Sequence, residues 1–207
     1  MALVKLNNRG VRSATAFGSI SALGEMIFIK KQTASSSATI SFVNGSSDVV
    51  LDNTYKEYLF TFNNIHPATD NVSFDFNGSD DDSSHSYDVT KTSSFFQAFH
   101  NEADSDYGLQ YSTSADLAQG TGFQNIVKNQ GNDNDQSCSG YLRLFNPSST
   151  TYVKHFLCTT VGVSHHDYQR TMYVAGYGNT TSAVDAVQFK MSSGNIDAGD
   201  ICLYGIN

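Results

Sequence analysis

The chain has 207 residues, of which 39% are hydrophobic and 12% aromatic, enough apolar material for one large domain with its own core. Charged residues make up only 15% of the sequence, well below the roughly 25% of ordinary globular domains. The net charge of −8 argues against a nucleic-acid surface over most of the chain, because phosphate contacts need clustered lysine and arginine.

The first 37 residues differ in charge from the rest. They hold five basic side chains and one acidic side chain, a net charge of +4, whereas residues 38–207 hold seven basic and nineteen acidic ones, a net charge of −12. The segment is also rich in apolar residues, so we expect it to pack on its own domain or within an assembly. Within it, MIFIKK (26–31) predicts a short strand and QTASSS (32–37) a flexible joint.

We therefore predict an N-terminal anchoring arm over residues 1–37, and a solvated basic terminus is the alternative. The candidate anchoring residues are Lys5, Asn7, Asn8, Arg9 and Arg12. The start MALVKLNNRG lacks the apolar segment of a signal peptide, and no run approaches the length of a membrane span. We expect a protein that is made and folded without export.

The clearest strand pattern lies in residues 55–76. Tyr58, Phe60 and Phe62 alternate with polar or smaller residues, and the alternation restarts in VSFDF (72–76). Between them NNIHPATDN (63–71) interrupts the pattern, and its proline removes a hydrogen-bond donor from the ladder. We predict two half-buried strands around a corner of about ten residues, both carrying aromatic side chains into a shared core.

Further alternating segments follow along the chain at intervals of about ten residues, without a convincing helix. They are ATISFV (38–43), YDVTKT (87–92), SFFQAFHNE (94–102), QNIVKN (124–129), CSGYLRLFNP (138–147), TYVKHFLCTTVG (151–162), QRTMYVAGYG (169–178), AVDAVQFKM (183–191) and DICLYGI (200–206). The last two are joined by SSGNIDAGD, which predicts a hairpin link. This pattern predicts an all-β domain over residues 38–207, an antiparallel β-sandwich of jelly-roll-like type.

Two polar loops are the candidate ligand sites, FNGSDDDSSHS (76–86) and NQGNDNDQS (129–137). The residues concerned are Asp80, Asp81, Asp82, Asn132, Asp133 and Asn134. A calcium ion in such a loop is one interpretation and a solvated loop is the other, because the ligand spacing of an EF-hand is not present. Tyrosine and asparagine in the loops are compatible with binding of a glycan or receptor.

The sequence offers little else that indicates chemistry. The histidines lack a placed third ligand for a metal, and no GxSxG elbow or glycine-rich phosphate loop occurs. Cys138, Cys158 and Cys202 are far apart and odd in number, which favours buried thiols over a disulfide framework or zinc site. We predict no catalytic residue, metal or cofactor.

The chain resembles a group of virion structural proteins encoded by tailed phages, many of them marine. The matching stretches are LVKLNNRGVRSATAFGSI (3–20), YKEYLFTFNNIHPATD (55–70), FHNEADSDYGLQY (99–111), QSCSGYLRLFNPSSTTYVKHF (136–156) and AGYGNTTSAVDAVQFKMSSGNIDAGDICLYGI (175–206). The resemblance implies a component of the virion with a jelly-roll-like sandwich and no enzymatic role. A capsid decoration or head fibre and a tail fibre or other tail component both stay open.

Together these observations predict a non-enzymatic structural protein of a tailed-phage particle, made in the host cytoplasm and docked through its arm. The expected partners are other virion proteins and further copies of the chain, with a homotrimer favoured because apolar arms of single sandwiches are commonly buried between copies. We expect no nucleic-acid or membrane partner. The alternative is a receptor- or glycan-binding module of a tail fibre, in which the two polar loops form the site.

Overall fold

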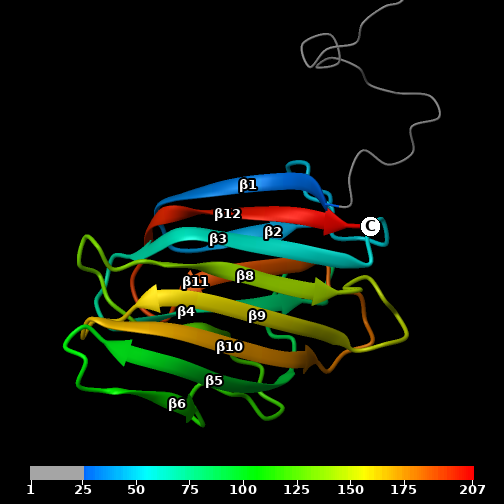
Figure 1. Ribbon diagram of the computed structural model, residues 1–207. Coiled ribbons are helices and arrows are strands. Elements are labelled where there is room, and N and C mark those ends of the chain that lie inside the picture. Colours follow the sequence, from blue (N-terminus) through cyan, green and yellow to red (C-terminus); the bar gives the residue numbers. More distant parts are fainter. Residues whose placement is uncertain (1–25) are drawn as a thin grey trace, which may run out of the picture.

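The computed structural model describes residues 26–207, which form twelve strands and no helix (Figure 1). The strands are β1 (Met26–Ser37), β2 (Ile40–Val43), β3 (Glu57–Pro67), β4 (Val72–Ser79), β5 (Lys91–Asn101), β6 (Tyr107–Tyr111), β7 (Gln124–Gln130), β8 (Cys138–Phe145), β9 (Lys154–Val163), β10 (Tyr168–Gly178), β11 (Ala186–Met191) and β12 (Ile196–Ile206).

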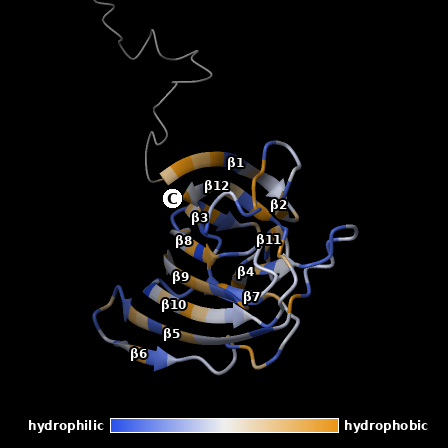
Figure 2. Cartoon of the chain, turned by 90° about the vertical axis from the view of Figure 1, so that its right-hand side faces the viewer, coloured by the Kyte–Doolittle hydropathy of each residue, from blue (hydrophilic) through white to orange (hydrophobic). Residues whose placement is uncertain are grey.

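The strands build two antiparallel sheets that pack face to face (Figure 2). The larger sheet has eight strands in the order β1-β12-β3-β8-β9-β10-β5-β6, and the smaller has four in the order β2-β11-β4-β7. The predicted antiparallel β-sandwich is therefore confirmed, while the jelly-roll description stays a prediction.

The core between the sheets is built from the alternating aromatic residues that the sequence singles out. Tyr58, Phe60 and Phe62 of β3 and Phe74 and Phe76 of β4 are all buried, as predicted. Because β3 belongs to the large sheet and β4 to the small one, their side chains meet across the interior.

Phe189 of β11 lies at the centre of this aromatic core. Its ring centroid is 5.3 Å from those of Phe60 and Phe62 in edge-to-face geometry and 5.8 Å from Phe74 in a stacked geometry. Phe42 and Phe76 complete the shell at 6.3 and 6.4 Å. Aromatic pairs at these separations add to the free energy gained by burying their area, so Phe189 ties four strands of both sheets together.

The predicted boundary between arm and sandwich at residue 37 needs correction. Residues 26–37 form one continuous strand that pairs with β12 from Met26 opposite Ile206 to Ser37 opposite Ile196. The serine-rich segment is part of this strand because its backbone continues the hydrogen-bond ladder, which needs no apolar side chains. The predicted anchoring residues, all before residue 26, lie outside the described residues.

The predicted corner between β3 and β4 is shorter than expected. The strand continues through a bulge, where Asn64 has φ of 50° and the pairing with β8 shifts between Phe62 and Ile65. Pro67 is then the last residue of β3, a position where its missing N–H is tolerated. Only residues 68–71 are left for the turn, since the bulge absorbs the interruption of the sequence pattern.

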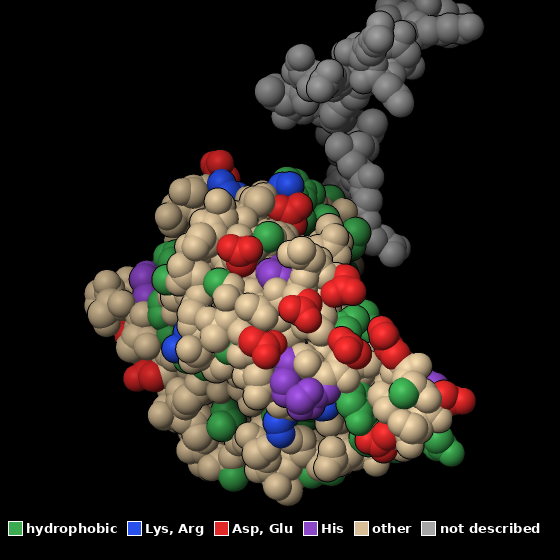
Figure 3. All heavy atoms as spheres, turned by 90° about the vertical axis from the view of Figure 1, so that its left-hand side faces the viewer, with side chains coloured by type: hydrophobic (Ala, Val, Ile, Leu, Met, Phe, Trp, Pro, Cys, Tyr) green, Lys and Arg blue, Asp and Glu red, His purple; other side chains and the backbone are tan. Residues whose placement is uncertain are grey.

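The sandwich has two distinct ends. At the proximal end Met26 pairs with Ile206, and the loops 44–56, 80–90, 146–153 and 179–185 lie there. The distal end carries the turns and loops 68–71, 102–106, 131–137, 164–167 and 192–195. Figure 3 looks onto the distal end, where acidic side chains surround a group of histidines.

Candidate functional site

The outer face of the large sheet, which points away from the core, is unusually apolar. Among the residues described, eleven large hydrophobic side chains are at least 39% exposed, and ten of them lie on this face. They are Met26, Phe28, Phe96, Tyr107, Leu109, Tyr111, Tyr141, Leu157, Val161 and Tyr173. The eleventh, Tyr152, lies in the loop between β8 and β9. We call this surface the outer face.

Strand register aligns these side chains into rows. Tyr141 of β8 is opposite Thr159 of β9, which is opposite Tyr173 of β10. Tyr173 is in turn opposite Phe96 of β5, and Phe96 is opposite Tyr111 of β6. The rings of Phe96 and Tyr173 stack with centroids 5.0 Å apart. Directly opposed residues on one face of a sheet touch, so the row forms one continuous apolar band.

The middle of the outer face is hollowed. One shallow depression is lined by Phe96, Tyr141, Thr159 and Tyr173, and a second by Phe145, His155 and Tyr177, and both share Leu157 and Ala175. Small side chains at positions 159 and 175 create these hollows between larger aromatic neighbours. The face can therefore accept protruding side chains of a partner.

Two ion pairs lie on the outer face. Arg143 of β8 forms an ion pair with Glu57 of β3 at 2.5 Å, and the Glu57 carboxylate raises the pKa of Arg143. Lys31 of β1 forms another with Asp200 of β12 at 3.1 Å. These pairs leave the part of the face over β1, β3, β8 and β12 without net charge, although the chain as a whole is acidic. At the β5–β6 edge, Asp104 lies 2.9 Å from His100 and Asp116 accepts a hydrogen bond from Tyr111.

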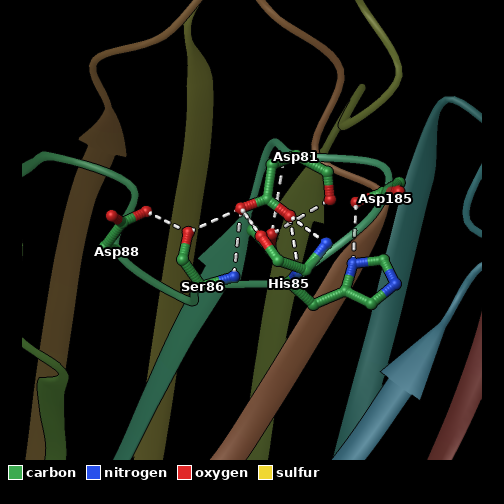
Figure 4. Close-up of polar contacts among 7 residues, drawn as sticks. Asp81, His85, Ser86, Asp88 and Asp185 are labelled. Carbon is green, nitrogen blue, oxygen red and sulfur yellow. Dashed lines mark hydrogen bonds and ion pairs between the residues drawn. The ribbon is translucent and has the colours of Figure 1, made fainter.

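The first candidate ligand loop lies at the proximal end and is organised by Asp81 (Figure 4). Its carboxylate accepts hydrogen bonds from the backbone N–H groups of Ser84, His85 and Ser86 and from the hydroxyl groups of both serines. The hydroxyl and amide of Ser86 lead the interactions that hold the pKa of Asp81 well below its usual range. The carboxylate oxygens of Asp81 are therefore occupied by hydrogen bonds within the loop.

The other acidic residues of this loop differ in their surroundings. Asp80 accepts a hydrogen bond from the hydroxyl of Thr180 at 2.6 Å, while Asp82 is exposed. Nearby, Nδ1 of His85 lies 3.7 Å from Oδ1 of Asp185, too far for a hydrogen bond, and burial raises the pKa of Asp185. These groups give the loop a defined shape.

The second candidate loop lies at the distal end. Asn132 donates to the carbonyl of Ala68 at 3.4 Å, and the carbonyl of Asp133 lies 3.2 Å from Nε2 of His66. Asn134 is exposed and lines a shallow hollow with His66 and Asp197. Its polar groups are more accessible than those of the Asp81 loop.

The structure does not bring the two candidate loops together. Val72 at the start of β4 pairs with Gln130, next to the distal loop, whereas Ser79 at its end pairs with Ala186, next to the proximal loop. Seven residue steps of an extended strand separate these points by about 23 Å. A single ligand site formed by both loops is therefore excluded, and each would have to act alone.

Two buried lysines were not singled out by the sequence. Lys91, at the start of β5, donates to Oδ1 of Asn77 at 2.5 Å and to the carbonyl of Val89 at 2.7 Å, and burial lowers its pKa to about 7. Lys154, at the start of β9, donates to three loop carbonyls, of Ser149, Tyr152 and Thr180. Burial also lowers its pKa.

Both lysines line a small apolar cavity between the sheets. Their amines are engaged by two and three oxygens respectively, so they tie the proximal loops to the core. The alternation in β9 places Lys154 on the same side as Phe156 and Cys158, and the structure shows that this side faces the core.

Cys138 and Cys158 are buried free thiols, as predicted, and burial raises the pKa of Cys138 to about 12. Cys202 is only half buried, on the outer face. Within residues 26–207 no three histidine, cysteine or acidic side chains converge as metal ligands do. The same residues contain no helix with the length and apolar character needed to cross a bilayer. Comparison of the chain with protein-family models, curated proteins and solved structures gives no match.

Proposed function

We propose that this chain is a non-enzymatic structural component of a tailed-phage particle, docked through its N-terminal residues and present as a homo-oligomer, with a trimer favoured. The observation that carries the proposal is the outer face, an apolar surface on an acidic sandwich. Exposed apolar surfaces of this kind are typical of proteins that work in assemblies. The resemblance to virion structural proteins supports the same role, together with a jelly-roll-like connectivity and a virion location.

Docking through the N-terminal residues agrees with where the described chain begins. Met26 enters the sandwich beside Ile206, so both termini of the described domain lie at the proximal end (Figure 1). If the partner that holds Lys5, Asn7, Asn8, Arg9 and Arg12 lies at the proximal end, the distal end points away from it. Other virion proteins with acidic surfaces suit these cations.

Immunogold labelling of purified particles tests the proposal, with an antibody raised against residues 26–207. Label over the head would assign the protein to capsid decoration or head fibres, and label confined to the tail would assign it to a tail fibre or another tail component. Label on neither part of intact or opened particles would refute the proposal. Simultaneous replacement of Lys5, Arg9 and Arg12 by alanine should reduce the copies per particle, and unchanged incorporation would remove the anchoring role.

A second candidate function is binding of a receptor or glycan at the distal end. It is favoured by the exposed polar groups of Asn134 and Asp197, which line one hollow at that end together with the half-buried His66. Binding on a glycan array that is lost in Asn134→Ala, but kept in the proximal variant Asp82→Ala, would support it. An array without binding would count against this second function.

A further inference from the structure

We propose that the outer face is the surface through which copies of this chain associate with one another. The inference deepens the proposed assembly role, since it names the contact surface and its occupant. Three properties of the face point to a second copy: its area, its charge and its side-chain chemistry.

The area of the face matches what a specific interface requires. Eight strands about 4.8 Å apart span about 34 Å. Seven of them have 8–12 residues, about 26–40 Å, and β6 has five, so the face measures on the order of 1,000 Å². Specific interfaces bury about 800 Å² on each partner. The face is large enough for a stable contact, even when its rim stays in solvent.

The net negative charge of the molecule favours this face over the rest of the surface for contacts between copies. Residues 26–207 hold nine basic and nineteen acidic side chains, so two copies repel one another over most of their surface. On the outer face the Arg143–Glu57 and Lys31–Asp200 pairs cancel. A second copy can therefore approach here with little electrostatic cost, while an acidic partner gains nothing specific from it.

The side chains of the face are those of a protein interface. Tyrosine, phenylalanine, methionine and arginine are enriched at the centre of such interfaces, and Tyr141, Tyr173, Phe96 and Arg143 form the centre here. Leu157 and Val161 add aliphatic groups between the rings. A sugar needs hydrogen-bond partners for its hydroxyl groups, and aliphatic side chains cannot supply them, so a glycan suits this face less well than protein.

The test measures the mass of the full-length protein in solution, for the wild type and two variants. Leu157→Glu with Val161→Glu places two negative charges at the centre of the face, at side chains that are 45% and 46% exposed. Tyr152→Glu is the matched control, since Tyr152 is 69% exposed but lies off the face. Sedimentation velocity gives the masses and dissociation constants, and thermal unfolding shows that each variant is folded.

We expect the wild type and the Tyr152→Glu control to have the same mass, a multiple of 22.5 kDa. The double variant should dissociate, with a dissociation constant raised by about 100-fold or more, because charges at the centre of an interface remove its strongest contacts. A folded double variant that keeps the wild-type mass would overturn the proposal.

A monomeric wild type would also overturn it, whether the face is covered by residues 1–25 or binds a polysaccharide. Hydrogen exchange of the full-length protein and binding to polysaccharide would identify those two cases. These results are independent of the immunogold experiment. A monomer that labels phage particles would leave the virion role intact, and it would remove both the homo-oligomer and this interface.

Discussion

Lys91 tests whether burial without a carboxylate partner leaves a lysine uncharged in the folded protein. Its side chain is only 2% exposed and donates to Asn77 and Val89, with no carboxylate in hydrogen-bond contact. Burial without such a partner disfavours the charged amine, which is why its pKa falls from 10.5 to about 7. Lys91→Met removes the titrating group and keeps most of the volume of the side chain.

The sign of the pH dependence follows from the direction of this shift. Between about pH 7 and about pH 10.5 the unfolded chain binds a proton that the folded protein does not, so the free energy of unfolding rises with pH. The stabilisation is complete above the unfolded pKa and is lost as the pH falls through about 7. From about pH 7 to about pH 9.5, Lys91 alone should add about 2–3 kcal/mol to the free energy of unfolding.

Urea unfolding at these two pH values measures the effect as a difference between proteins. The wild type should gain about 2–3 kcal/mol more than Lys91→Met over this window, because other titrating groups contribute equally to both. Lys56→Met, the same change at an exposed lysine of the proximal end, should follow the wild type. If Lys91→Met and the wild type show the same pH dependence, Lys91 is charged in the folded protein and the reasoning is refuted.

Two further substitutions test the core. Phe189→Ala should lower the free energy of unfolding by about 3–5 kcal/mol, because it leaves a cavity among five aromatic rings. Urea unfolding measures this change, and a loss below about 1 kcal/mol would show that the core closes around the smaller side chain. Burial raises the pKa of Asp75 from 3.8 to about 6. Between these two values the folded protein holds a proton that the unfolded chain has lost, so the contribution of Asp75 to the free energy of unfolding is present at low pH and is lost as the pH rises to about 6. Asp75→Asn should therefore stabilise the protein by about 1–2 kcal/mol at pH 7 but not near pH 4, and a gain of the same size at both values would contradict the assignment.

The sequence predicts the strands well where the residues on one face of the strand are apolar and those on the other face are polar. In β3 and β4 the aromatic residues occupy one parity, and burial of Phe60, Phe62, Phe74 and Phe76 follows directly from the period of two. In β5 the alternation separates Phe95 and Gln97 from Phe96, but both sides carry phenylalanine, and the structure shows that Phe95 and Gln97 are buried and Phe96 is exposed. Such local alternation needs no knowledge of which strands pair.

Connections between the sheets were harder to predict, because they depend on pairing across the chain. The segment 192–200 has the composition of a hairpin turn, yet β11 pairs with β2 and β4 in the small sheet while β12 pairs with β1 and β3 in the large one. The predicted hairpin link is therefore wrong. Turn-forming residues fix where the chain bends but not whether the next strand stays in the same sheet.

The outer face could not be predicted from local pattern. In β9 both parities are apolar, with Phe156 and Cys158 on one side and Leu157 and Val161 on the other. The sequence alone does not say which side is covered by the small sheet, and the register with β8 and β10 decides it. Large apolar residues on both sides of a central strand are themselves a signal that both faces of the sheet are covered in the assembled state.

The two proposals together restrict how copies can be arranged. The strands of the outer face run between the proximal and distal ends (Figure 1). If the proximal end of every copy faces the particle, all proximal ends point the same way. A twofold axis perpendicular to the strands would turn the Met26 residues of two copies in opposite directions, whereas a rotation axis roughly parallel to the strands keeps them together. Three copies that turn their outer faces toward such an axis would bury these faces and gather the distal loops at one tip, away from the particle.

The side chains around His66 and Asp197 would then be displayed three times at the surface that a host receptor meets first, so weak binding at each site would be strengthened by multivalency.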